Sequence, residues 1–489
     1  MSSSLHRVSF SIASILAAGA MAQSLVPASI VVQAGDIPAG QAGTIGNLNP
    51  PFTDADGRVG FTGSLTGAVT TNFVWYDTGI VWTNAMAPGG FVLSGAETSC
   101  GVGAGGQFLY SPSINGNDGI WGNHGYVIAD GDPAPGAPGL FISFASRPIM
   151  SGNGIGTFIA GLSTTPGGSS QGRAVYRYDN QPNPSVQLVF RTGDVVFPAP
   201  HNFPINTATP TVSFTYDFSD NGLHHIHFIG LVTGAAFNDG YIYLDGTPLM
   251  REGDLTGLPG ETWENFTAVG VNNSGQSVVC GDTNASAFFD GFVACNGQIA
   301  VREDDLIRGV HLLGPSTPQS VSINNCGLVV HVWTVGSGSS AVRHVFVGDV
   351  NNLLHSSERV VSVGDLLDTN ADSIADYQVK AINATTIASQ GVDLADDGGL
   401  YLELVISTPG QSDDREAIVR FSVPACVPAC APCVADFNNS GGTPDDADVA
   451  AYFEAWNNGD VCADANASGG TPDDADVAEF FMLWNNGGC

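Results

Sequence analysis

A tight turn that recurs along most of the chain is the sequence feature that most constrains its fold. The pattern Asn/Asp/Ser-x-x-Gly-x-x-x-apolar occupies residues 54–61, 151–158, 219–226, 272–279, 324–331 and 395–402, the last two copies being imperfect. A glycine that follows small polar residues adopts the positive φ of a tight turn, and the alternation after it is typical of a strand. Each copy therefore predicts a β-hairpin.

A second recurring element is an apolar strand that ends in Gly-Asp. It occurs at Asp36, Asp132, Asp194, Asp254 and Asp365, with degenerate copies at 304–305 and 95–96. Counting from one such position to the next gives seven units, the second of them short. Units of roughly 50 to 60 residues with several short strands are typical of propeller blades. We predict a mainly β protein with a seven-bladed β-propeller at residues 23–424; a β-sandwich pair or an irregular solenoid is the alternative.

The composition favours turns and strands and excludes some partners. The chain has 489 residues, 63 glycines and 27 prolines, and only 12% of its residues are charged. Its formal charge of −33 argues against nucleic acid and against an anionic membrane surface, because both would repel it. Metal cations and neutral partners, such as glycans and proteins, suit this charge better.

Residues 1–22 have the features of a secretory signal peptide. Arg7 supplies positive charge, residues 10–20 are apolar, and residues 20–22 form a small-x-small cleavage site. The apolar run is too short for a stable membrane-spanning helix. We predict that the protein is secreted or attached to the cell surface, with no membrane insertion after signal cleavage.

The hairpin repeat resembles a known family of secreted proteins. That family is named for its NxxGxxxF motif, and its members often end in assorted surface anchors. The resemblance covers most of the body through short, degenerate motifs. It implies a propeller-like module and no established activity.

The strongest motif lies after Cys433, in a duplicated acidic segment. Residues 435–449 recur as residues 463–477, and each copy continues into Trp-Asn-Asn-Gly. Alternate residues of such a loop can point inward and supply the six to eight oxygens that calcium requires. We expect two EF-hand-like calcium sites with these ligands: Asp436, Asn438, Ser440, Asp445 and Asp448 in the first loop, and Asp464, Asn466, Ser468, Asp473 and Asp476 in the second.

A helix with one apolar stripe follows each loop. Val449, Tyr452, Phe453 and Trp456 have the spacing i, i+3, i+4 and i+7, which residues 477–484 repeat. Two such units can pack face to face around their aromatic side chains. The alternative is a disordered acidic tail, but disorder does not require aromatic residues at helical spacing. Residues 425–432, rich in Pro, Ala and Cys, are expected to form a short stiff linker.

Residues 433–489 resemble a dockerin, specifically the variant that ends the chain with Gly-Cys. Dockerins are paired calcium loop-helix units that dock into a cohesin-type receptor on a scaffold or cell surface. Two features depart from the family. The loop is one residue longer than the usual twelve, and serine at the fifth position removes one charge from each site. At the loop ends, 446–447 and 474–475 are Asp-Ala pairs, so the resemblance implies a cohesin-like or another surface receptor.

Export would permit disulfides among the nine cysteines. Five of them lie in the C-terminal region, and Cys280 and Cys295 are close enough in sequence to bridge one hairpin. A zinc site at Cys426, Cys430 and Cys433 is an alternative, but a second ligand pair with matched spacing is missing.

The body offers few candidates for catalysis. On a strand, His225 and His227 would share a face and could hold a metal, although they follow a turn where polar residues are often merely solvated. The repeated Gly-Asp aspartates could converge as carboxylate pairs for sugar hydrolysis, but their recurrence favours a turn role in which they accept backbone hydrogen bonds. Catalytic residues therefore stay unassigned.

Two functions follow from these features. The first is a non-catalytic β-propeller that binds a glycan or protein and is displayed through the calcium module. The second is a secreted carbohydrate-active enzyme, a glycoside hydrolase or lyase, carried on a dockerin. A channel lined by Thr, Ser and Gly would favour the first. Carboxylate pairs with aromatic platforms would favour the second.

Overall fold

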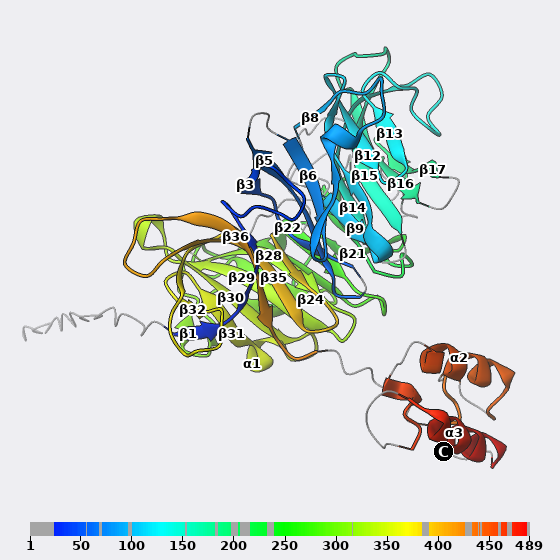
Figure 1. The fold of residues 1–489 in the computed structure, drawn as a ribbon, viewed down its shortest axis with the longest axis vertical. Coiled ribbons are helices and arrows are strands. Elements are labelled where there is room, and N and C mark those ends of the chain that lie inside the picture. The colour runs from blue at the N-terminus through cyan, green and yellow to red at the C-terminus, as the bar shows by residue number, and fades with distance from the viewer. Residues whose placement is uncertain are drawn as a thin grey trace, which may run out of the picture.

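The structure is a computed structural model of the chain (Figure 1). It describes residues 24–54, 56–67, 71–95, 100–151, 154–180, 184–196, 204–205, 216–231, 239–314, 316–383, 391–425, 433–438, 440, 443–457, 461–466 and 472–486. The predicted signal peptide, almost all of the predicted linker, and Ser468 lie outside the described residues.

The body is built from antiparallel sheets that follow one another along the chain. The first contains β3 (Thr44–Leu48), β4 (Phe52–Thr53), β5 (Val59–Thr66), β6 (Thr71–Tyr76) and β7 (Gly79–Thr83). The second contains β8 (Leu93–Ser94), β9 (Cys100–Gly103), β10 (Gln107–Tyr110), β11 (Ser113–Ile114), β12 (Asn117–Gly122) and β13 (Gly125–Ala129). The third contains β14 (Phe141–Met150), β15 (Ile155–Ser163), β16 (Gly172–Asp179) and β17 (Ser185–Arg191).

The remaining sheets continue this arrangement. The fourth contains β18 (Tyr216–Phe218), β19 (His225–Gly230), β20 (Gly240–Leu244) and β21 (Thr247–Arg251), and the fifth β22 (Trp263–Val271), β23 (Ser277–Thr283), β24 (Gly291–Cys295) and β25 (Gln298–Arg302). After the small pair β26 (Leu306–Ile307) and β27 (Val310–His311), the sixth contains β28 (Thr317–Ile323), β29 (Leu328–Val335), β30 (Val342–Asp349) and β31 (Glu358–Ser362). The last joins β1 (Leu25–Pro27) and β2 (Ser29–Gln33) to β32 (Leu366–Asp368), β33 (Tyr377–Ile382), β34 (Val392–Leu394), β35 (Gly399–Ser407) and β36 (Arg415–Ser422).

These sheets form a propeller, which confirms the mainly β prediction but not the predicted number of blades. Six sheets contain a regular run of four strands, whereas the sheet over residues 93–129 has the order β8-β11-β12-β10-β9 with β13 beside β12. The structure therefore has six regular blades, where the sequence predicts seven blades. The unit that departs is the short second one, where residues 107–122 are divided among β10, β11 and β12, of four, two and six residues, instead of one hairpin.

Hydrophobic clusters join each sheet to the next and close the ring. Each of seven clusters combines residues of two consecutive sheets, represented by Phe61 with Tyr401, Val74 with Val102, Leu109 with Ile142, Ile149 with Ile229, Phe228 with Phe266, Val293 with Val321, and Val347 with Val379. The first of these pairs joins the last sheet to the first, and β36 lies beside β3 (Figure 1). A closed ring excludes both the sandwich pair and the open solenoid.

The recurring glycine turns fold as the sequence predicts. In all six copies the glycine amide donates to the carbonyl three residues earlier, as from Gly275 to Asn272 at 3.0 Å. Each of these glycines has a positive φ between 66° and 81°. Non-glycine residues rarely adopt this conformation, which explains why glycine occupies this position in every copy of the repeat.

The Gly-Asp aspartates have the predicted structural role. The carboxylates of Asp36, Asp132, Asp194, Asp305 and Asp365 each accept a hydrogen bond from the backbone amide three residues earlier, at 2.8–3.0 Å. They therefore stabilise the turn after each outer strand, rather than converging as catalytic pairs.

The predicted bridge between Cys280 and Cys295 is not formed. Both side chains are buried free thiols, as is Cys100. Cys280 on β23 lies opposite Val293, whereas Cys295 on β24 lies opposite Val278, so the hairpin register separates the two cysteines by two positions. Burial raises the pKa of both thiols to about 12.

Helices are confined to short turns in the described part of the body and to the C-terminal module. The short ones are η1 (Asn84–Met86), η2 (Ala104–Gly106), η3 (Gly338–Ser340), α1 (Leu353–Ser356) and η4 (Val461–Ala463). The two longer helices are α2 (Asp446–Asn457) and α3 (Asp474–Asn485), the positions where the apolar stripes predict them. No helix among the described residues has the length and apolar character needed to span a bilayer.

Candidate functional site

The first tail loop folds back onto the start of α2. The carboxylate of Asp448, only 1% exposed, accepts hydrogen bonds from the amides of Asn438 at 3.1 Å and Asp445 at 2.8 Å. At the other end of the loop, the side-chain oxygens of Asp436 and Asn438 both accept from the amide of Ser440. The predicted donors are thereby held around one loop, with Asp448 closing it.

The second loop has the same geometry. Asp476, also 1% exposed, accepts from the amides of Asn466 at 3.2 Å and Asp473 at 2.7 Å. The amide of Asp473 is the main cause that lowers the pKa of the Asp476 carboxyl, and a hydrogen bond from Asp464 lowers it further. The first and last carboxylates of this loop therefore lie within hydrogen-bonding reach of each other.

The side chains of Asp445 and Asp473 cap the helices that follow them. Each carboxylate accepts from the amide two residues later, in Ala447 and Ala475, at 2.8 Å. Asp473 is thus the N-cap of α3, in a capping box with Asp476. Helix capping is the contact the structure gives these two carboxylates, while their role as calcium ligands stays a prediction.

The two loop-helix units pack against each other around aromatic side chains. Tyr452 on α2 stacks on Phe480 of α3, with ring centroids 3.9 Å apart and planes 8° from parallel. Trp456 donates its indole hydrogen to the carbonyl of Asp473 at 3.1 Å, and Trp484 donates to the carbonyl of Asp445 at 3.3 Å. Each helix thus supports the loop of the other unit, and the two predicted sites are physically connected.

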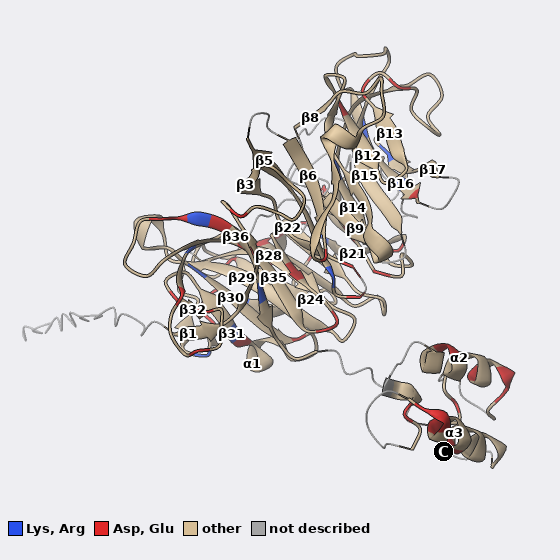
Figure 2. Ribbon diagram, viewed as in Figure 1, with Lys and Arg blue, Asp and Glu red and all other residues tan. Residues whose placement is uncertain are grey.

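The donor set of these loops fits calcium. Carboxylate, amide and hydroxyl oxygens are the ligands that a hard cation prefers. Figure 2 shows the positions of acidic residues on the ribbons of α2 and α3, and residues 433–489 contain eleven acidic residues and no lysine or arginine. In the described residues, Asp436, Asn438, Ser440 and Asp448 would hold the first ion, and Asp464, Asn466 and Asp476 the second.

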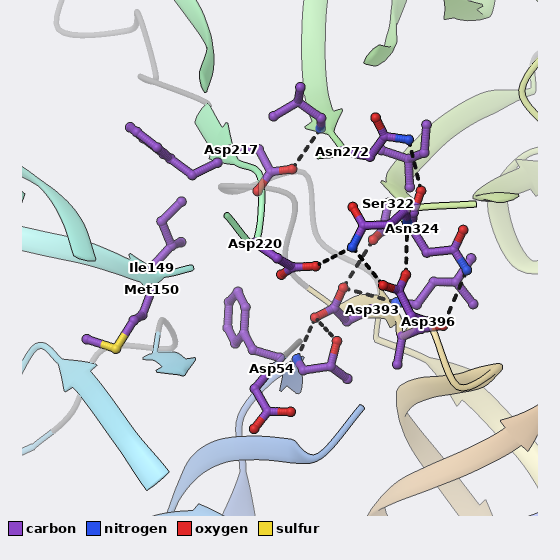
Figure 3. Close-up of a pocket in the computed structure, with 18 of the residues that line it drawn as sticks. Asp54, Ile149, Met150, Asp217, Asp220, Asn272, Ser322, Asn324, Asp393 and Asp396 are labelled. Atoms are coloured by element: carbon purple, nitrogen blue, oxygen red, sulfur yellow. Dashed lines mark hydrogen bonds between the residues drawn. The ribbon is translucent and has the colours of Figure 1, made fainter. Parts of the chain in front are cut away.

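A second candidate site lies where the glycine turns converge at the centre of the ring. Figure 3 shows this pocket, which is lined by residues from every sheet except the second. The cavity has a volume of about 80 Å³. It is lined by carboxylates and amides from the turns and from the strands beside them, namely Asp54, Asp217, Asp220, Asn272, Asn324, Asn325, Asp393 and Asp396.

A belt of hydrogen bonds connects consecutive turns around this pocket. The amide of Asn221 donates to the side chain of Asn273, the amide of Asn273 to Asn325, and the amide of Asn325 to Asp396, each at 2.8 Å. In each of these pairs, the side chain of the second residue of one turn accepts a hydrogen bond from the backbone of the turn in the preceding sheet. This belt gives the polar residues of the repeat a structural role that the sequence did not reveal.

The pocket carboxylates differ in how fully they are engaged. Asp393 accepts from the amide and hydroxyl of Thr53, and from the hydroxyl of Ser322 at 3.1 Å. Asp217 accepts from the amide of Val271 at 3.0 Å, and Asp220 from the side-chain amide of Asn325 at 2.9 Å. Burial raises the pKa of Asp217 and of Asp220 to about 7, with neighbouring carboxylates contributing.

These raised pKa values predict that stability falls as pH rises. A carboxyl whose folded-state pKa lies above its unfolded value stabilises the fold fully below about pH 4, and this stability is lost as pH rises through 7. The free energy of unfolding of Asp217→Asn/Asp220→Asn should therefore exceed that of the unchanged protein by a few kcal/mol at pH 8, and by much less at pH 5. Urea unfolding at the two pH values measures this. Asp413→Asn, at an exposed carboxylate, is the control and should show no such gain.

The expectation that the histidine cluster is merely solvated is wrong for His227, which is buried, while His224 and His225 are partly exposed. His227 is 0% exposed and neither ring nitrogen has a hydrogen-bond partner, because the strand turns it into the packing between sheets. Burial lowers the pKa of His227 well below its usual value and also lowers that of His225. By contrast, the buried His331 bonds Ser357 and Trp333 through its two ring nitrogens.

A further acidic loop, at residues 368–376, was not predicted as a metal-site candidate. Asp368, Asn370, Asp372 and Asp376 repeat the alternate spacing of the tail loops, a signal visible in the sequence. Here the carboxylates accept amides of the loop itself, as Asp368 does from Ser373 at 2.9 Å. Across the described residues, no three His, Cys, Asp or Glu side chains converge as a metal site, in this loop or elsewhere.

Comparison with known proteins gives limited similarity. A family of unknown function, DUF7453, matches residues 111–353, which span the second to sixth sheets. No curated protein matches the chain.

Several solved structures match the chain at low identity and with TM-scores below 0.5. Puromycin hydrolase is 10% identical, with a TM-score of 0.40, over 78% of this chain and 53% of that chain. Trypanosoma rangeli sialidase is 11% identical, with a TM-score of 0.34, over 81% and 59%. TolB from Acinetobacter baumannii is 10% identical, with a TM-score of 0.30, over 72% and 77%. The chain thus spans about half the length of the hydrolase.

Proposed function

We propose that this protein is an exported β-propeller that binds a protein or glycan and is held at a scaffold or cell surface by its C-terminal module. The observation that carries this proposal is the pair of equivalent loops, each closed by a buried aspartate at the start of a helix. Two calcium ions would neutralise the acidic loops and hold α2 and α3 in a fixed arrangement. The paired helices would then present a defined surface to a cohesin-like or another surface receptor.

The propeller would supply the binding surface. We propose that the irregular sheet over residues 93–129 acts as a seventh blade, since its clusters bridge the first and third sheets. Gly101 supports this placement, because a Cβ there would lie 2.2 Å from the backbone nitrogen of Met150. The close approach is that of two packed blades.

The test separates calcium binding from receptor binding. The full chain should bind the cell-envelope fraction of the encoding organism in millimolar calcium and be released by EGTA. Asp448→Ala/Asp476→Ala should lose both calcium and envelope binding. Asp446→Ala/Asp474→Ala changes exposed residues beside the loops and should keep calcium while weakening envelope binding. Envelope binding that persists in EGTA would contradict the proposal.

A carbohydrate-active enzyme is the second candidate, and the central pocket favours it. Asp217 and Asp220 lie together there, and Phe52 and Phe218 also line the pocket. A carboxyl with a pKa near 7 can act as a general acid or base at neutral pH. The volume of about 80 Å³ is below the roughly 300 Å³ of an ordinary ligand pocket, however, so a sugar would require the turns to open. Polysaccharide hydrolysis that Asp217→Asn or Asp220→Asn abolishes would establish this function instead.

A further inference from the structure

One disulfide-bonded cysteine lies in the propeller rather than in the tail module. The described cysteines that are disulfide-bonded are Cys326, Cys433 and Cys462, whereas the free thiols are those of Cys100, Cys280 and Cys295. The chain has nine cysteines, and the remaining ones are Cys426, Cys430 and Cys489. Every cysteine that could pair with Cys326 therefore follows β36 in the sequence.

Cys326 lies on the outside of a glycine turn. It is the third residue of the turn at 324–327 in the sixth sheet, and its backbone amide donates to the side chain of Asn324 at 3.2 Å. The residue is exposed, whereas Cys280 and Cys295 are buried. A cysteine from another segment can therefore approach the Cys326 side chain without entering a sheet.

The chain leaves the propeller beside this turn. The amide of Asn325 donates to the carboxylate of Asp396 at 2.8 Å, so the turn of the sixth sheet contacts the turn of the last sheet. After β36, the amide of Val423 donates to the carbonyl of Gly398 at 2.9 Å. A Cβ on Gly398 would lie 2.9 Å from the nitrogen of Ala425, so the end of β36 covers the last turn.

The next turn around the ring indicates where the Cys326 side chain points. Asp397 occupies the third position of its own turn, as Cys326 does, and its carboxylate covers the glycine of the following sheet: a Cβ on Gly57 would lie 2.7 Å from the Asp397 carboxyl carbon. By the same relation, Cys326 would cover Gly398. The backbone of Ala425 already lies against Gly398, so the two segments meet there.

The spacing selects one partner. A disulfide requires Cα atoms about 4.4–6.8 Å apart, and consecutive residues are about 3.8 Å apart. Cys426 directly follows Ala425, the last described residue of this stretch, whereas Cys430 is four residues further along. We propose that Cys326 and Cys426 form a disulfide that fastens the end of the propeller to its central face.

Formation of this bond is a simple thiol oxidation. Each thiol loses one hydrogen as the S–S bond forms, and the two hydrogens with their electrons reduce a disulfide oxidant to two thiols. Oxidants of this class act outside the cytoplasm, where the predicted signal peptide would direct the chain.

The bond would have two structural consequences. It encloses residues 326–426, which include β32 to β36, and so holds the last sheet to the sixth by a covalent link in addition to the strand pairing of β2. It also fixes the point at which the tail begins, beside the central pocket that Asn325 and Asp396 line.

Non-reducing peptide mapping of the full chain tests this proposal. The purified protein is oxidised with glutathione disulfide, alkylated with N-ethylmaleimide and digested with trypsin. No lysine or arginine follows Arg420, so trypsin releases residues 421–489 and residues 309–343, which have Cys326 as their one cysteine. The two peptides should be recovered as one species that dithiothreitol separates. Cys426→Ser should abolish this species, and the matched control Cys430→Ser should retain it.

Thermal unfolding gives a second measurement of the same bond. Cys326→Ser/Cys426→Ser should lower the melting temperature of the propeller by about 5 °C, because the bond no longer restricts the unfolded chain. Dithiothreitol should produce the same shift in the unchanged protein and no further shift in the double variant. Cys430→Ser should melt as the unchanged protein does.

Three results would overturn the proposal. The first is alkylation of Cys326 in the oxidised chain. The second is a joined species that persists in Cys426→Ser or disappears in Cys430→Ser. The third is an unchanged melting temperature in the double variant. Because the purified chain is oxidised in vitro, none of these results depends on export; a chain that forms the bond in vitro but is isolated from cells in the reduced state would count against the predicted secretion alone.

Discussion

Chelation of calcium is expected to unfold the two-helix module while the propeller stays folded. The module has a small aromatic core around Tyr452 and Phe480, and its loops hold many carboxylates close together. A site occupied at 100 times its dissociation constant contributes about 2.7 kcal/mol, so two sites contribute about 5 kcal/mol. That equals the whole stability of many small domains. EGTA should therefore abolish most of the helical circular dichroism signal at 222 nm, since the described body is almost free of helix.

Single substitutions should remove the two calcium sites one at a time. In a calorimetric titration, Asp448→Ala or Asp476→Ala should bind one calcium equivalent instead of two. Each substitution also removes the two hydrogen bonds that the carboxylate accepts from amides of its loop. The reciprocal bonds of Trp456 and Trp484 should make the remaining site weaker as well. Asp474→Ala, exposed in the first turn of α3, should cost only about 0.3–1 kcal/mol and keep both ions. A helix signal that is indifferent to EGTA would remove the basis of the calcium assignment.

Removal of residues 24–33 should destabilise the propeller more than any single substitution. Strand β2 pairs along the edge of β36, and Val32, 4% exposed, fills the cluster between the last sheet and the first. Its loss would leave β36 an open edge and expose Ile418, which is 0% exposed in the intact ring. We expect a loss of several kcal/mol, at about 1 kcal/mol for each lost hydrogen bond in addition to the lost burial. The melting temperature should fall sharply, and the protein should aggregate.

A peptide with the sequence of residues 24–33 provides the control. Added in trans, it should pair with β36 as the missing strand and restore part of the melting temperature, whereas a scrambled peptide should not. Deletion of residues 433–489 should leave the melting temperature of the propeller unchanged. An unchanged melting temperature in the strand-deleted protein would show that β2 does not close the ring.

Local features of the fold were predictable from the sequence. The glycine turns, the Gly-Asp turns and the stripes of α2 and α3 depend on residues close together in the chain, whose spacing is visible directly. The duplicated tail belongs to the same class, because a short loop and the helix after it contain all the expected ligands. The pocket at the ring centre was not predicted, since Asp217 and Asp393 come from strands far apart in sequence.

The sequence by itself determined the turn chemistry, the strand-rich character and the acidic duplicated module, because these depend on backbone preferences and short-range spacing. Only the tertiary structure decided how the second sheet departs from its neighbours, how β2 closes the ring, why Cys280 and Cys295 stay apart, and how His227 is buried. Each of these depends on which distant strands pack together. That choice follows from side-chain fit between sheets, as at Gly101 against Met150, which no local pattern encodes.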